Sequence, residues 1–168
     1  MKLDKGTVHI VGDHIDTDQI YPGRYIEITN PAEISDHCLE GVDPSLRGRM
    51  KPGDFVVAGQ NFGCGSSREH AAITLLHSGV GAVVAESFAR IFYRNAINLG
   101  LPAIVCPGVS QKVTDGDEIS LDVAEGLLIN HSTGETLKCE QLSTYVMEIL
   151  SNGGIKPLFR KRLLEKND

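Results

Sequence analysis

The sequence predicts one α/β domain with a mostly parallel sheet, and three observations support this. Short apolar runs rich in β-branched residues occur at Phe55–Ala58, Gly81–Ala85 and Pro102–Cys106, as is typical of buried strands. Helical segments lie between these runs, and successive strand–helix–strand units imply parallel strands with right-handed crossovers. No repeat, low-complexity segment or linker interrupts the chain, so residues 1–168 are expected to form a single domain.

The first half of the chain contributes two strands and two helices. Thr7–Val11 is expected to open the sheet, and Ala32–Leu39 to form a short helix. After the strand Phe55–Ala58, a helix is predicted to begin at Ser66, because Ser66 and Glu69 have the spacing of a capping box, and to end at a glycine, Gly79.

The second half begins regularly and then changes character. Phe88–Leu99 is predicted as a helix ended by Gly100. After Pro107 an antiparallel pair of strands is expected around a Glu-Gly turn, followed by two helices separated by Asn-Gly-Gly. These segments are Glu118–Asp122 and Leu127–Asn130 for the strands, and Thr144–Leu150 and Lys156–Glu165 for the helices.

Composition excludes several classes of protein. The 168 residues are 41% hydrophobic, which suits a chain with a substantial core. The net charge is −6 and the basic residues form no stripe except near the C-terminus, so nucleic acid is not an expected partner. Since there is neither a long apolar run nor a signal-peptide pattern, no membrane association and a cytoplasmic location are expected.

The four cysteines predict reduced thiols. They are widely spaced, without a Cys-x-x-Cys pair: Cys38, Cys64, Cys106 and Cys139. An iron–sulfur cluster held wholly by this chain is not expected, because such ligands normally include closely spaced cysteines. A nucleophilic role stays open for Cys64, which lies between two glycines with His70 six residues later.

The segment Asn61-Phe-Gly-Cys-Gly-Ser-Ser-Arg-Glu69 is the strongest candidate site. Gly63 and Gly65 would let the backbone approach a ligand, and a helix N-terminus and the fork of donors on Arg68 would attract an anion. The plain alternative is that Ser66 only caps a helix. A Walker-type phosphate loop is excluded, because the Gly-Lys-Ser/Thr ending is missing.

Two further motifs stand at fixed positions around this segment. Asp16-Thr-Asp18 precedes it, in an acidic stretch that lacks the spacing of an EF-hand and could be only a polar loop. Ser87-Phe-Ala-Arg-Ile-Phe-Tyr-Arg-Asn95 follows it. With these motifs in order from Gly12 to Pro107, the chain closely resembles the small subunits of 3-isopropylmalate dehydratase, in the aconitase superfamily.

The resemblance implies a fold, a partner and a reaction. The fold would be the aconitase-type swivelling β/β/α domain, with a small antiparallel element toward the C-terminus. The partner would be a separate large subunit that carries a 4Fe-4S cluster, with no metal bound by this chain. Together they would act as a hydro-lyase that interconverts 2-isopropylmalate and 3-isopropylmalate in leucine biosynthesis. The isolated subunit would be folded and inactive, with homo-oligomers possible.

The resemblance also implies roles for individual residues. Ser66 would be the catalytic base, with the helix N-terminus and nearby cations making its hydroxyl acidic enough. Arg68 would hold a substrate carboxylate, Ser67 would donate a further hydrogen bond, and Asp18 would line the closed site. Arg90 and Arg94, four residues apart on one helical face, are either solvated or support the catalytic loop or the large subunit.

A specificity loop is implied at Tyr25, Ile26, Glu27 and Ile28. Homoaconitase-type subunits tend to carry an arginine at the position of Glu27, which here would repel an extra carboxylate. Ile26 and Ile28 could contact an isopropyl group, so isopropylmalate is favoured. A glutamate beside that group, and Arg24 just before the loop, leave the small subunit of a 2,3-dimethylmalate dehydratase or a homoaconitase as alternatives.

Two other classes of function remain. A stand-alone serine or cysteine hydrolase would be active without a partner and would depend on Ser66 or Cys64. A non-catalytic anion-binding module would bind a carboxylate or phosphate by itself through Arg68.

Overall fold

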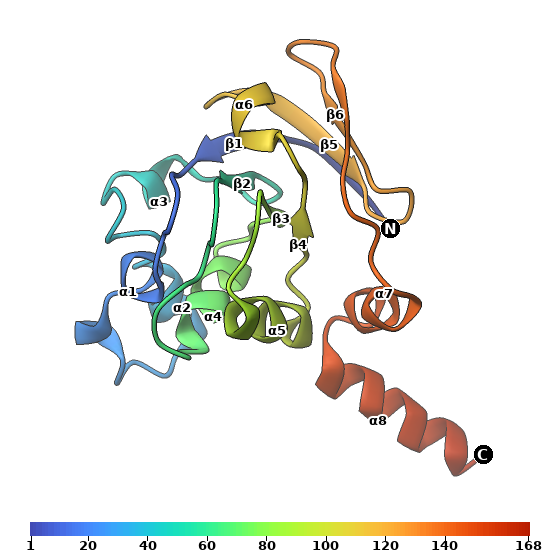
Figure 1. The fold of residues 1–168 in the computed structure, drawn as a ribbon. Helices are drawn as coiled ribbons and strands as arrows, with labels where there is room; N and C mark the ends of the chain where they lie inside the picture. Colours follow the sequence, from blue (N-terminus) through green and yellow to red (C-terminus); the bar gives the residue numbers. More distant parts are fainter.

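The computed structural model describes residues 1–168 and contains one seven-stranded sheet in the order β4-β3-β2-β1-β5-β6-β7 (Figure 1). The strands are β1 (Lys2–Ile10), β2 (Phe55–Ala58), β3 (Ala82–Ala85), β4 (Ala103–Val105), β5 (Glu118–Asp122), β6 (Leu127–Asn130) and β7 (Thr136–Lys138). The long strand β1 belongs to both halves of this sheet. Its C-terminal part pairs in parallel with β2, and its N-terminal part pairs antiparallel with β5.

Most helices pack on one face of the parallel half of the sheet, and in Figure 1 α8 extends away from the rest of the molecule to the C-terminus. The helices are α1 (Thr17–Ile20), the 3-10 turn η1 (Gly23–Tyr25), α2 (Pro31–Ser35), α3 (Leu46–Arg49), α4 (His70–His77), α5 (Arg90–Leu99), α6 (Val109–Lys112), α7 (Thr144–Ser151) and α8 (Ile155–Lys166). The chain therefore has the predicted α/β class, with parallel strands first and antiparallel strands toward the C-terminus.

The two edges of the sheet meet, so the sheet curls on itself. Glu140, just after β7, donates its backbone N–H to the carbonyl of Val105 at the end of β4, at 2.8 Å. The buried thiols of Cys106 and Cys139 lie in contact at the same place. Closure of this kind satisfies backbone groups that an open edge strand would expose.

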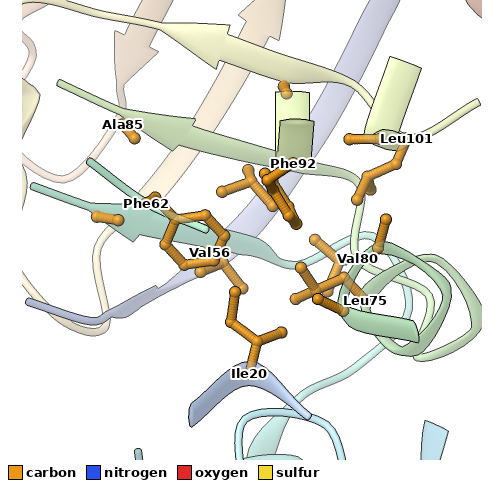
Figure 2. Packing of buried hydrophobic residues seen from close by; sticks show 14 of the residues in the cluster. Ile20, Val56, Phe62, Leu75, Val80, Ala85, Phe92 and Leu101 are labelled. Carbon is orange, nitrogen blue, oxygen red and sulfur yellow. The ribbon is translucent and has the colours of Figure 1, made fainter. Parts of the chain in front are cut away.

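Curling produces two cores, one on each face of the parallel strands. Val56 and Ala58 belong to a cluster of 24 buried residues shared with the helices, and Figure 2 shows Ile20, Leu75 and Phe92 gathered in it. Phe55 and Val57 face a second cluster of 15 buried residues inside the curl. Because both faces are buried, β2 is an uninterrupted apolar run rather than an alternating one.

A buried carboxylate fixes the start of β2. Asp54 accepts hydrogen bonds from the backbone N–H groups of Lys51 (2.9 Å) and Thr7 (3.1 Å) and pairs with His9 Nε2 (2.8 Å). Burial acts to raise the pKa of Asp54, but the hydrogen bonds outweigh it and hold the pKa below its ordinary value. This network ties β1 and β2 together at the end opposite the candidate site.

The predicted elements are present, but three predicted helices have different boundaries in the structure. The helix predicted to begin at Ser66 begins at His70, and Glu69 at its N-cap makes no side-chain capping bond. The capping-box prediction was therefore wrong, because Ser66 is engaged with another part of the chain. The helix predicted from Phe88 begins at Arg90, and the helix predicted over residues 32–39 ends at Ser35.

Candidate active site

The candidate site lies where the loops after β1, β2 and β3 meet. In the loop after β2, Gly63 donates its N–H to Ile15, and Cys64 accepts from Thr17, both at 2.8 Å. On its other side, Phe62 bonds to the carbonyl of Ser87 and accepts from Ala89, at 3.0 and 2.9 Å. The loop is thus held between its two neighbours at the carboxyl ends of parallel strands, where open α/β sheets bind ligands.

Gly63 lets this loop pack tightly. Its φ is +87°, and a Cβ built on it would overlap Phe92, which is buried at the base of α5. Only glycine adopts this backbone conformation without cost and also leaves room for the ring. The glycine in this motif therefore brings the loop against α5, in addition to exposing backbone.

Ser66 lies at the rim of this arrangement, in a side-chain contact that sequence analysis missed. Its Oγ is 3.0 Å from the Oγ1 of Thr17, which is buried at the start of α1. Ser66 itself is exposed. Because the Thr17 side chain is fixed by its surroundings, it limits the rotamers open to the Ser66 hydroxyl.

An open cavity of about 830 Å³ adjoins Ser66 and is lined by Asn61, Gly63, Gly65 and the first turns of α5. Ala89, Arg90 and Ile91 at the start of α5 face this cavity, and Arg94 lines it one turn further along. No side chain caps α5, and the backbone N–H groups of residues 90–92 have no acceptor. The positive end of a helix was predicted here, but α5 provides it and α4 does not.

Arg68 and Asp18, both predicted as site residues, are brought together from 50 positions apart. Arg68 Nη1 is 3.2 Å from Asp18 Oδ1, which also accepts the backbone N–H of Gly23 at 2.7 Å. The Gly23 hydrogen bond and then the Arg68 guanidinium hold the pKa of Asp18 below its ordinary value. Arg68 is therefore oriented by Asp18 and does not line the cavity; its neighbour Ser67 is exposed.

The predicted specificity loop is organised by Glu40, a residue that no motif indicated. The Glu40 carboxylate contacts Arg24 (2.6 Å), the hydroxyl of Tyr25 (2.9 Å) and His37 Nδ1 (2.6 Å). The rings of Tyr25 and His37 stack at 3.6 Å. Burial acts to raise the pKa of Glu40, but hydrogen bonds from His37 and Tyr25 outweigh it, so the pKa is lowered.

These contacts divide the loop into a fixed part and a free part. Tyr25 is held by its partners, Ile28 is half-buried, and Ile26 and Glu27 are exposed. Arg24, which could have altered carboxylate recognition, is occupied by Glu40 and lies over the Tyr25 ring. Ile26 and Glu27 are the side chains of this loop most accessible to a ligand.

Apart from the contact between Cys106 and Cys139, the cysteines lie in separate parts of the fold. No group of three or more His, Cys, Asp or Glu side chains is placed to hold a metal ion. Cys38 is buried, and burial raises the pKa of its thiol to about 11. Cys64 is half-buried in the site loop, while Cys106 and Cys139 lie buried at the closure of the sheet.

This fold and site define a swivelling domain of the aconitase type, and comparison with known families agrees. Residues 17–107 match the aconitase C-terminal domain. An isopropylmalate/citramalate isomerase small subunit from Methanocaldococcus jannaschii is 50% identical over 161 residues, covering 96% of each chain. A 3-isopropylmalate dehydratase small subunit from Methanopyrus kandleri is also 50% identical, covering 94% of this chain and 92% of the relative.

The structural comparison gives the same result. The crystal structure of a 3-isopropylmalate dehydratase from Methanocaldococcus jannaschii matches with a TM-score of 0.95 and 43% identity, covering 99% of this chain and 98% of the other. The chain belongs to the family of 3-isopropylmalate dehydratase small subunits, and it is therefore a subunit of a hydro-lyase. None of its helices has the length and apolar character needed to cross a membrane.

Proposed function

We propose that this chain, assembled with a separate large subunit, interconverts 2-isopropylmalate and 3-isopropylmalate in leucine biosynthesis. The observation that carries the proposal is the position of Ser66, at the rim of a cavity lined by two arginines and the free N–H groups of α5. This combination suits the removal of a proton next to a carboxylate, which needs both a base and positive charge.

Ser66 would act as the base. It takes the proton from the carbon next to the hydroxyl-bearing carbon and keeps it, and the electron pair of that C–H bond forms the double bond. The C–O bond breaks and releases hydroxide, which takes a proton from solvent to become water. Rehydration with the hydroxyl on the neighbouring carbon gives the isomer. Because a serine hydroxyl is a very weak acid, the α5 N-terminus, the nearby guanidinium groups and exclusion of water are necessary for this role.

Arg68, Ser67 and Asp18 would bind the substrate next to Ser66. The guanidinium of Arg68 would donate to a substrate carboxylate, with Ser67 as a further donor. Asp18 contacts Arg68 on its Nη1 atom, so it would orient the guanidinium and leave its other N–H groups for the ligand. Asp18 and Arg68 are thus assigned to substrate positioning.

The rest of the site would come from the large subunit. A 4Fe-4S cluster held there would supply a Lewis acid for the departing hydroxyl. This requirement agrees with the cavity beside Ser66, which is open on this chain. Partner, cluster and substrate would then meet on one face, at the ends of β1, β2 and β3.

Isopropylmalate is the substrate favoured by the exposed part of the specificity loop. Ile26 offers an apolar contact to a branched alkyl group, and Glu27 would repel a third carboxylate such as that of citrate or homocitrate. Citramalate is a second candidate, because the relative from Methanocaldococcus jannaschii is named for both acids. The two acids differ only in the alkyl group that this loop would contact.

The test is an anaerobic assay of this chain mixed with cluster-loaded large subunit. Isopropylmalate, citramalate, 2,3-dimethylmalate, citrate and homocitrate would be compared, with each subunit alone as a control. We expect activity only in the mixture and greatest with isopropylmalate. Ser66→Ala should assemble normally but lose turnover; normal turnover by this variant would exclude Ser66 as the base, and activity of the chain alone would exclude the shared site.

A further inference from the structure

Two arginines in the cavity beside Ser66 have no acidic partner. Arg90 and Arg94 lie one turn apart on α5, both are exposed, and neither makes an ion pair. Four other arginines, Arg24, Arg49, Arg68 and Arg162, each contact a carboxylate of this chain, whereas Arg47 and Arg160 also make no ion pair. Neither guanidinium of the α5 pair is therefore occupied by an ion pair within the subunit, although Arg90 also lines a neighbouring pocket with Glu86 and Glu140.

The cavity contains no acidic group to balance this charge. Its polar lining consists of Asn61, Ser66, the two guanidinium groups and the backbone at the start of α5. The chain as a whole carries a net charge of −6, whereas the charged side chains that line this cavity are all positive. Two guanidinium groups beside unpaired N–H donors form a strong site for a carboxylate.

Arg68 cannot account for both carboxylates of a malate derivative. It is held by Asp18 and does not line this cavity, although it is only two residues from Ser66. Ser66 thus has one cation group in its own loop and a separate pair on α5. If the reacting carbon of a dicarboxylate lies at Ser66 and Arg68 binds one carboxylate, the other carboxylate needs a separate cationic partner. Within the cavity, Arg90 and Arg94 are the cationic side chains that could bind it.

We propose that Arg90 and Arg94 form a second carboxylate subsite, which binds the substrate carboxylate that Arg68 does not hold. This subsite rests on the proposed function and adds residues to it. The bound group is a carboxylate of a small dicarboxylic acid. Its contacts are the guanidinium groups of both arginines and the free N–H groups at the start of α5.

The kinetic test uses Arg90→Gln, Arg94→Gln and the double variant in the assembled enzyme, with Arg160→Gln, an exposed arginine that also makes no ion pair, as the matched control. Each single variant should lower kcat/KM for isopropylmalate by about 10-fold to 100-fold, mostly through a higher KM, since a charge-assisted hydrogen bond is lost. Affinity for the large subunit should be unchanged. For one of the two monoamides of isopropylmalate, the arginine variants and the wild type should react equally, because the carboxylate in question is already neutralised.

A direct binding test separates this subsite from the proposed reaction. Succinate would be titrated into the ¹⁵N-labelled full chain, with sodium chloride at equal ionic strength as the control. The backbone amide signals of residues 89–92 should shift with succinate in the wild type and not in the double variant. If these shifts occur but the mixed subunits turn over no substrate, the proposed reaction fails and the subsite stands.

Three results would overturn the subsite. The first is an unchanged KM with weaker assembly, which would assign the arginines to an acidic surface of the large subunit. The second is that the arginine variants lose activity relative to the wild type by the same factor for both monoamides and for the diacid. The third is the absence of succinate-dependent shifts at residues 89–92 in the wild type.

Discussion

Replacing Gly63 by alanine tests the packing of the site loop most directly. The added Cβ would lie 2.8 Å from Cδ1 of Phe92 and closer still to its Cβ and Cγ. Phe92 is 3% exposed and its ring contacts those of Phe62 and Phe88, so it has no free space to move into. The φ of +87° adds a second cost, because alanine disfavours this region.

The two costs can be separated with Gly116. Gly116 has a φ of +86°, and a methyl group added to it would have nothing within 4 Å. Gly116→Ala should therefore lower the free energy of unfolding by about 1 kcal/mol, the cost of the backbone conformation alone. Gly63→Ala adds overpacking against Phe92, for a total of about 2–4 kcal/mol.

The measurement is urea unfolding of both variants and the wild type, followed by circular dichroism. A difference of at least about 1 kcal/mol between the variants is expected, or roughly 2–4 °C in melting temperature for a chain of this size. Equal destabilisation by both substitutions would refute the packing argument. It would mean that the loop can lift off α5 without loss, and that its position beside the cavity is not fixed by Gly63.

Three further predictions concern separate parts of the chain. Asp54→Asn should lower the free energy of unfolding at pH 7 by about 1.5–3 kcal/mol in urea titrations, since a buried charged acceptor is lost. Because folding lowers the pKa of Asp54, its contribution to the free energy of unfolding is present above the unfolded pKa of about 3.9 and is lost as pH falls through the folded pKa. The stability of the Asp54→Asn variant should therefore lack this part of the dependence on acid pH. An unchanged acid dependence would contradict a stabilising role for the Asp54 carboxylate. Iodoacetamide at pH 8 should label Cys64 in the native protein and leave the buried Cys38 unmodified, as read by peptide mass spectrometry, and equal labelling would contradict the burial. Thr17→Val should reduce kcat of the assembled enzyme about 10-fold with KM unchanged, because the Ser66 hydroxyl loses its hydrogen-bond partner. Thr17→Ser keeps a hydroxyl and should restore kcat. A Thr17→Val variant with normal kcat would exclude a role for Thr17 in positioning Ser66.

Local sequence signals were sufficient for most elements of the parallel half. Gly100 ends α5, as predicted, and the structure shows it in the left-handed conformation; the apolar run of β2 is buried on both faces. The strand β7 was missed because three residues, Thr136–Lys138, are too short to show an alternating pattern. Closure of the sheet through Val105 and Glu140 depends on curvature, which no local pattern encodes.

In the candidate site, too, local sequence patterns predicted some features, while contacts between distant residues determine others. The motif around Ser66 predicted a site in the loop that adjoins the cavity, but its capping-box spacing gave the wrong helix start. Ser66 bonds to Thr17, 49 positions away, and this tertiary contact replaces the local one. Glu40 has no sequence signature, because its role comes from three partners that meet only after the chain has folded.

The exposure of Ser66 bears on how the proposed reaction could work. A serine hydroxyl is a very weak acid, and beside open solvent water screens the cations of α5 that would favour its alkoxide. Arg90, Arg94 and the α5 N-terminus act at full strength only when the cavity is covered and the local dielectric constant falls. Covering the cavity by the large subunit would then serve two purposes, because it would bring a Lewis acid to the substrate and would make Ser66 a stronger base. On this reasoning the chain would be inactive alone because its own half of the site would remain hydrated, even with every proposed residue in place.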